Sequence, residues 1–236
     1  MAEHISRKDL KKDEFRETFA HGAEAVLSHQ TILIYGIVGL LVIALAGFAW
    51  WTYSQRQSAA AATAFDGAMK TFQQPVGTPP VAGETSYPDD TKKFSAAAQQ
   101  FADIAKKYPH SHAGEVAQYY QALSLEKLGK DDDAKKLLAG LEPGSDDVAG
   151  VARFELAQLD DRANQPDQAV ALYQKLIDKP SLLVPKPVAM LALANHYSQA
   201  NPSEAAKLYQ QIKSQYPDTP IAEQADQALS LLPGKS

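Results

Sequence analysis

Residues 31–53, TILIYGIVGLLVIALAGFAWWTY, carry no formal charge, and the nearest charged residues are Glu24 and Arg56. As an α-helix this segment would extend about 35 Å at ~1.5 Å per residue. That length crosses the roughly 30 Å hydrocarbon core of a bilayer. Two tryptophans and a tyrosine close the segment, and their rings suit the boundary between lipid and water. The sequence therefore predicts one transmembrane helix that contacts the lipid bilayer through residues 31–53.

Two other interpretations of this segment are a buried helix of a globular protein and a cleaved signal peptide. A buried helix is rarely apolar on every face over such a length. The tripeptide Ala44-Leu45-Ala46 has the small-x-small pattern of a cleavage site. However, the leader before it is long, and the apolar run continues beyond it. The sequence leaves cleavage after Ala46 open, and with or without it the C-terminal domain ends up across the membrane.

Lysine and arginine residues near the ends of the span predict its orientation. Five of them lie within residues 7–16, whereas only Arg56 and Lys70 follow closely on the other side. Because basic residues are retained in the cytoplasm, the N-terminus is predicted to be cytoplasmic. Residues 1–30 form a cytoplasmic amphipathic tail, whose apolar residues recur on roughly one helical face. A membrane-surface helix and a solvated tail are both compatible with this pattern.

Proline and glycine mark the next two boundaries. Residues 54–74 contain no proline and are rich in alanine, so they predict a helix that continues from the membrane span until Pro75. Residues 75–90 hold four prolines and two glycines, a density that neither a helix nor a central strand tolerates. This segment is predicted to be a mobile surface loop.

Composition excludes several classes of function. The chain carries 23 basic and 28 acidic residues, for a net charge of −5, and has no cysteine. Without a basic domain, nucleic acid is not an expected partner. Without cysteine, the chain forms no disulfide and no thiolate metal site.

A repeating pattern fills residues 91–232 and leaves residues 233–236 as a short tail. Alanine recurs at the same position of similar helical segments, followed four residues later by a large side chain. The alanines are Ala97, Ala134, Ala169 and Ala205, and the large residues are Phe101, Leu138, Tyr173 and Tyr209. Small residues let two helices approach, and the large residue one turn later fills the gap between pairs. A period of about 34 residues containing two helices is typical of tetratricopeptide repeats.

The junctions between the predicted helices support this interpretation. Gly129 and Asn164 are suited to the left-handed position that ends a helix. Asp131 and Ser203 are predicted to cap the helices that follow. Proline residues at 166 and 202 suit helix starts.

The sequence Tyr-Pro-x-Ser/Thr occurs at residues 108–111 and again at 216–219. With this motif, residues 91–232 resemble the tetratricopeptide-repeat domains of bacterial envelope proteins. Together with the tail and the anchor, the whole chain resembles the single-pass inner-membrane ancillary subunit family of the Sec translocon. The predicted fold is all-α, with one transmembrane helix and a tetratricopeptide-like α-solenoid of about three to four helix pairs. The chain departs from the repeat pattern at Gln118 and Gln121 and by an insertion at residues 182–187.

No catalytic, metal-binding or cofactor-binding motif emerges. His110 and His112 lie in a predicted turn with no third ligand nearby in the sequence. Acidic pairs such as Asp160-Asp161 lack the central glycine of a calcium loop. There is no phosphate-binding glycine loop. We therefore expect no enzyme activity, no metal or cofactor, and no small-molecule substrate.

A tetratricopeptide array presents a concave surface to peptides or protein segments. The first helix of each pair is expected to line it, although an aromatic residue at helical spacing also fits a core position. The candidate groove residues are Tyr119, Leu123, Lys127, Phe154, Gln158 and Arg162.

The resemblance implies a function in the bacterial envelope. The chain would be a single-pass protein of the cell inner membrane, with its C-terminal domain in the periplasm. Its partners would be Sec translocon subunits, a periplasmic chaperone and segments of exported client proteins. A structural adaptor of envelope assembly or cell division is the alternative.

Overall fold

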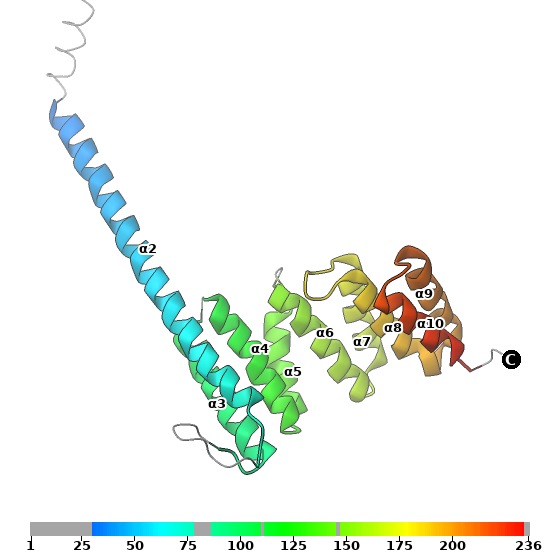
Figure 1. Cartoon of the computed structure of the whole chain (residues 1–236). Helices are drawn as coiled ribbons and strands as arrows, with labels where there is room; N and C mark the ends of the chain where they lie inside the picture. The colour runs from blue at the N-terminus through cyan, green and yellow to red at the C-terminus, as the bar shows by residue number, and fades with distance from the viewer. Residues whose placement is uncertain (1–29, 78–85, 110, 145–146, 234–236) are drawn as a thin grey trace, which may run out of the picture. The chain divides into compact units, whose positions relative to one another are not determined.

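The computed structural model describes residues 30–77, 86–109, 111–144 and 147–233, which form α-helices and no strand (Figure 1). The all-α prediction is confirmed. The helices of this described part are α2 (Gln30–Gln73), α3 (Asp90–Lys107), α4 (His112–Lys127), α5 (Asp131–Leu141), α6 (Asp147–Arg162), α7 (Pro166–Asp178), α8 (Lys186–Ala200), α9 (Pro202–Gln215) and α10 (Pro220–Ser230). The predicted tail, apart from Gln30, and residues 78–85 of the predicted loop lie outside the described residues. The chain divides into two compact units, Met1–Arg56 and Gln57–Ser236.

Helix α2 passes through both the predicted span and the predicted extension without interruption. Its apolar part has a mean hydropathy of 1.8, and none of that stretch is buried against other parts of the protein. Large side chains such as Leu40, Ile43 and Trp50 are exposed along it. By length and composition, this helix can cross a membrane.

The end of α2, within the second unit, is the first helix of the repeat array. Ala61 and Ala68 are buried against α3, and Phe65 and Phe72 pack beside them. The rings of Phe65 and Phe101 have centroids 5.6 Å apart. Small residues thus bring α2 close to α3, and aromatic rings fill the space between them. This first pair has the same construction as the later ones.

The remaining helices pair in chain order as α4 with α5, α6 with α7, and α8 with α9, and α10 packs on the last pair. Short connections make sequential helices antiparallel neighbours, as Figure 1 shows for this unit. The four repeat alanines are completely buried, and the large residues one turn later are buried with them. Interior positions therefore follow the period seen in the sequence.

The hydroxyl groups of the two Tyr-Pro-x-Ser/Thr motifs make the same hydrogen bonds. The Ser111 hydroxyl donates to the Tyr108 carbonyl at 2.9 Å and accepts from the Gly114 backbone N–H at 3.0 Å. The Thr219 hydroxyl likewise donates to the Tyr216 carbonyl at 2.7 Å and caps the start of α10. One hydroxyl in each turn therefore joins the end of one helix to the start of the next.

Four of the predicted junction features are confirmed and two are wrong. Pro166 and Pro202 begin α7 and α9. Gly129 and Asn164 are left-handed, with φ of 70° and 56°. Asp131 does not cap α5, because the helix begins at that residue. Its carboxylate instead lies in the first turn, where its negative charge interacts favourably with the helix dipole. Ser203 does not cap α9 either, because proline occupies the first helical position and Asn201, one residue earlier, caps the helix.

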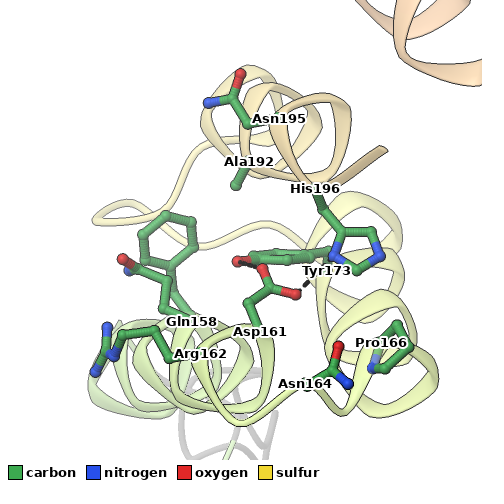
Figure 2. A pocket seen from close by; sticks show the side chains of 10 residues that line it. Gln158, Asp161, Arg162, Asn164, Pro166, Tyr173, Ala192, Asn195 and His196 are labelled. Atoms are coloured by element: carbon green, nitrogen blue, oxygen red, sulfur yellow. Dashed lines mark hydrogen bonds and ion pairs between the residues drawn. The ribbon is translucent and has the colours of Figure 1, made fainter. Parts of the chain in front are cut away.

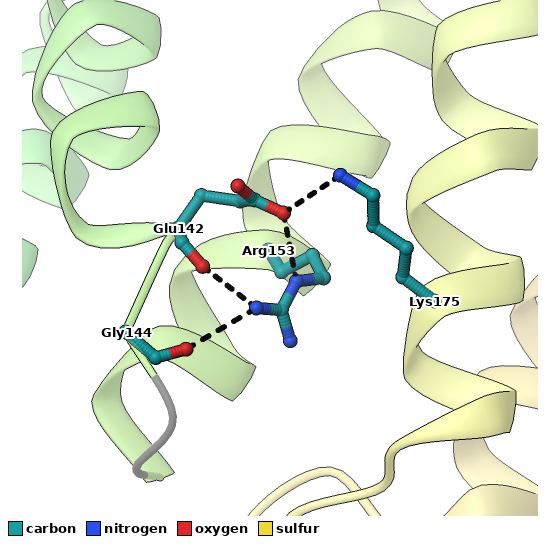
Figure 3. A network of polar contacts seen from close by, with 4 residues as sticks. All are labelled: Glu142, Gly144, Arg153 and Lys175. Atoms are coloured by element: carbon teal, nitrogen blue, oxygen red, sulfur yellow. Dashed lines mark hydrogen bonds and ion pairs between the residues drawn. The ribbon is translucent and has the colours of Figure 1, made fainter.

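A charged network links three helices at the turn after α5 (Figure 3). Arg153 of α6 donates to the Glu142 carboxylate at 3.0 Å and to the Glu142 carbonyl at 2.6 Å. Lys175 of α7 donates to the same carboxylate at 3.1 Å. Burial alone would raise the pKa of Glu142, but its hydrogen bonds with Arg153 and Lys175 lower it. The network fixes the α5–α6 turn against the next helix pair.

Replacing Gly114 with alanine is expected to destabilise the array. A Cβ atom there would lie 2.0 Å from the Tyr108 carbonyl oxygen, a backbone atom that cannot rotate away. Forced contacts of this kind cost about 1–3 kcal/mol. Thermal unfolding of the full-length chain in detergent, followed by circular dichroism, measures the change.

The matched control is Gly67→Ala. This glycine is also helical, but a Cβ atom there meets nothing within 4 Å. Alanine should therefore stabilise the helix by about 0.5–1 kcal/mol. Equal melting temperatures for the two variants would contradict the close approach at Gly114.

Candidate functional site

A cavity of about 540 Å³ lies where α6, α7 and α8 meet. Its wall combines aromatic rings with several amide and charged groups (Figure 2). The lining residues are Phe154, Gln158, Asp161, Arg162, Asn164, Pro166, Tyr173, Ala192, Asn195 and His196. Pairs α6–α7 and α8–α9 thus both contribute to one site.

Asp161 is the central polar group of this cavity. The Tyr173 hydroxyl donates to its Oδ2 at 2.9 Å, and His196 Nδ1 lies 2.6 Å from its Oδ1. A carboxylate can only accept, so Nδ1 of His196 carries the hydrogen in this pair. Burial raises the pKa of Tyr173, and the neighbouring negative charge of Asp161 raises it further. Asp161 therefore ties α6 to α7 and to α8.

The rim of the cavity is also fixed by hydrogen bonds. The Asn195 amide oxygen accepts from the Tyr209 hydroxyl at 2.7 Å, which orients the amide on α8. Arg162 donates to Glu126 of α4 at 2.8 Å, and about half of its side chain remains exposed. These polar groups are consequently held in defined positions before anything binds.

Three of the six predicted groove residues line the cavity. Phe154, Gln158 and Arg162 lie on α6 at intervals of four residues, so they share one face of that helix.

The other three predicted residues, on α4, do not line the cavity. Tyr119 is half-buried and packs against the cluster that α4, α5 and α6 form. Leu123 is half-buried and Lys127 is exposed. The repeat pattern predicted that these residues lie on the first helix of a pair, but it could not distinguish residues of the core from residues that line a cavity.

Glu155 interacts electrostatically with the predicted groove residues of both α4 and α6. This half-buried residue lies beside Phe154 on α6. Burial raises its pKa, and the nearby charge of Glu126 on α4 raises it further, while Arg162 and Lys127 act in the opposite direction. Glu155 also contributes, after burial, to raising the pKa of Tyr119. The inner faces of α4 and α6 therefore share one partly buried charged cluster.

Seven lining residues were not predicted. Tyr173 carried a signal as a repeat position, but its hydroxyl also reaches the cavity. Asp161 was noted only as part of an acidic pair, and its neighbour Asp160 is buried and paired with Lys135 at 2.8 Å. His196 and Asn195 had no sequence signal, because their role depends on how one repeat packs on the next.

The ten lining residues include no serine, threonine or cysteine, and their polar groups are amides, one carboxylate, one guanidinium, one phenol and one imidazole. Across the described residues, no three histidine, aspartate or glutamate side chains gather as a metal site. His112 is an exposed first residue of α4, and His110 lies outside the described residues.

Comparison with known families gives two matches. Residues 28–181, more than half of the chain, match the model of the tetratricopeptide repeat-like domain. Residues 189–219 match the model of the tetratricopeptide repeat. No curated protein and no solved structure matches the chain.

The variant Glu155→Gln is expected to raise the stability of the array at neutral pH. The pKa of Glu155 is higher in the folded state than in the unfolded state. Its contribution to the free energy of unfolding is therefore fully present below the unfolded-state pKa and is lost as the pH rises through the folded-state pKa. The neutral amide of glutamine does not ionise, so the variant should be more stable at neutral pH by up to about 1 kcal/mol, the scale expected for a partly exposed group. Urea unfolding at neutral pH and near pH 4.5 measures the difference.

Glu223→Gln, at an exposed position on α10, controls for the removal of one charge. The advantage of Glu155→Gln should shrink as the pH is lowered. An advantage that grew towards acid pH would contradict the assigned direction.

Proposed function

Because the chain belongs to the tetratricopeptide repeat-like domain family, we propose that its helical array is a scaffold that binds a protein segment in the cavity between α6 and α8. Domains of this kind are generally non-enzymatic scaffolds for protein–protein interaction. The cavity carries the proposal, since seven of its ten lining residues come from α6 and α8, the first helices of two consecutive pairs. Repeat arrays of this kind present extended concave surfaces for binding.

The chemistry of the cavity suits a peptide segment. Its volume lies within the range of about 300–1,000 Å³ typical of ligand sites. Phe154 offers an apolar surface for a side chain. Gln158 and Asn195 carry amides, groups that can both donate to and accept from a peptide backbone. Arg162, half-exposed on the rim, adds one positive charge.

The membrane attachment is proposed for α2. The helix is long and apolar enough to span a bilayer, and the matched family model begins at residue 28, so it includes the apolar segment. The excess of basic residues before the span favours a cytoplasmic N-terminus. The array would then lie in the periplasm, anchored to the inner membrane.

The proposed partners are Sec translocon subunits, a periplasmic chaperone and exported client segments. This part of the proposal rests on the resemblance in domain order and in the Tyr-Pro-x-Ser/Thr turns. Anchoring would act by raising the local concentration of the binding surface at the membrane. No catalytic step, cofactor or small-molecule substrate is required.

A photo-crosslinking amino acid at Gln158 is expected to capture a protein partner in living cells. The same amino acid at Ala171, exposed on α7 and outside the cavity lining, is the matched control. Mass spectrometry of the crosslinked species identifies the partner. Crosslinks that form at Gln158 and not at Ala171 are expected to contain translocon, chaperone or client polypeptides.

Crosslinks from position 158 to cell-wall or division proteins would instead favour the function of a structural adaptor in envelope assembly or division. Equal capture at both positions would mean that the cavity is not the binding surface.

Single cysteines are expected to report the orientation of the span, because the native chain has none. A membrane-impermeant maleimide applied to cells with a permeabilised outer membrane should label Ser58→Cys and leave Ser6→Cys unlabelled until the inner membrane is lysed. Ser58 is exposed on α2. Labelling of Ser6→Cys in intact inner membranes would reverse the orientation, and a shortened polypeptide would reveal cleavage after Ala46.

A further inference from the structure

Glu155 of α6 is a half-buried carboxylate that the array leaves without a partner. Among the described residues, no side chain or backbone group forms a hydrogen bond or an ion pair with it. Burial raises its pKa, so the ionised form is costly in the folded array. A charged group that lowers the stability of a fold and pairs with nothing in it suggests a role in binding.

The positive charges around Glu155 do not satisfy it. Arg162 donates to Glu126 of α4 at 2.8 Å, so this guanidinium serves the neighbouring glutamate. Lys127 is exposed at the end of α4. Together, Arg162 and Lys127 lower the pKa of Glu155 by less than burial and the charge of Glu126 raise it. The surface between α4 and α6 is therefore complementary to one further positive charge.

Glu155 lies next to the cavity on the same face of α6. Glu155, Gln158 and Arg162 follow each other at intervals of three and four residues, so they share that face. Gln158 and Arg162 line the cavity, as Figure 2 shows, and Glu155 is one helical turn before Gln158. A turn spans about 5.4 Å, which is less than two residues of an extended chain. A segment bound in the cavity would therefore bring a neighbouring side chain to Glu155.

Helix α4 supplies the opposite wall of this surface. Tyr119, Leu123 and Glu126 are four and three residues apart, so they share one face of α4, and all three are half-buried. Burial raises the pKa of Tyr119, and the charge of Glu155 raises it further, so the phenol lies near that carboxylate and stays neutral. An aromatic ring, an aliphatic side chain and a carboxylate together suit the stem and the charged head of arginine or lysine.

We propose that the surface between α4 and α6, formed by Tyr119, Leu123 and Glu155, binds an arginine or lysine side chain of the segment that occupies the cavity. The cationic group would donate to the Glu155 carboxylate, and its aliphatic stem would lie over Leu123 and the ring of Tyr119. This inference rests on the proposed function of the cavity. It adds the chemistry of the partner: a basic residue adjacent to the residues that α6, α7 and α8 hold.

Peptides that bind the cavity are the probes for this inference. A random dodecapeptide library is selected against the full-length chain in detergent. Selected peptides are retained if a photo-crosslinking amino acid at Gln158 captures them and the same amino acid at Ala171 does not. Each retained peptide is then synthesised in two forms, with its arginine or lysine intact, and with citrulline or acetyllysine in its place, which removes the charge.

Fluorescence anisotropy measures the Kd of both forms for the unaltered chain and for Glu155→Gln. The retained peptides are expected to share a basic residue. Removing its charge should weaken binding to the unaltered chain about tenfold. With Glu155→Gln, both forms should bind with nearly equal affinity, because the pair no longer interacts. Glu223→Gln, exposed on α10, controls for the attraction of any basic peptide to an acidic protein and should retain the tenfold difference.

Two results would overturn the inference and leave the proposed function standing. The first is a set of cavity-binding peptides that share no basic residue. The second is an equal loss of affinity with the unaltered chain and with Glu155→Gln when the charge of the peptide is removed. If position 158 captures no peptide at all, the cavity itself is not a binding site, and both the proposed function and this inference fail.

Discussion

Close approach of paired helices, made possible by alanine, is the constraint on which the array depends. Ala97, Ala134, Ala169 and Ala205 have no exposed surface, and each is followed one turn later by a large buried side chain. A larger residue at any of these positions would separate two helices along their length, and the gap-filling ring or leucine would lose its contacts. The turns with their hydroxyl caps and the left-handed residues set where each helix ends, but the small-to-large alternation sets the distance between helices. The cavity depends on this spacing, because α6 and α7 of one pair and α8 of the next carry the side chains that surround it.

Most of the fold could be predicted from the sequence because its signals are local and repeated. The alanine period, the proline-marked helix starts and the left-handed Gly129 and Asn164 are each encoded within a few residues. The caps of α5 and α9 were mispredicted by one or two positions. In α9 a proline in the first turn moves the cap to the residue before it, and in α5 the helix begins one residue earlier than expected, at Asp131 itself. The apolar composition of residues 31–53 predicted the first part of α2. Its continuation to Pro75 was predicted because residues 54–74 contain no proline and are rich in alanine.

The site was only partly predictable, for a different physical reason. Phe154, Gln158 and Arg162 could be assigned to one helix face from spacing alone. The bond between Asp161 and His196 joins residues 35 apart in the chain, and it depends on the rotation of one helix pair against the next, which the period does not encode. The same holds for Leu182 and Leu183 in the α7–α8 turn, which are exposed: the sequence shows an insertion there, but only the packing of Val184 and the bond from the Leu182 N–H to Asp147 determine which side chains remain outside.

The continuity of α2 has a consequence for how the array folds. Starting a helix is unfavourable, because several residues must be ordered before the first hydrogen bond forms, whereas lengthening an existing helix adds one bond per residue. The first helix of the array requires no such start, since it is an extension of a segment that is already helical. In a solenoid, each repeat is stabilised mainly by its neighbour, so order can spread from one end. Packing of Phe101 against Phe65 and Phe72 would then be the first tertiary step, and the array would grow pair by pair from the end of α2.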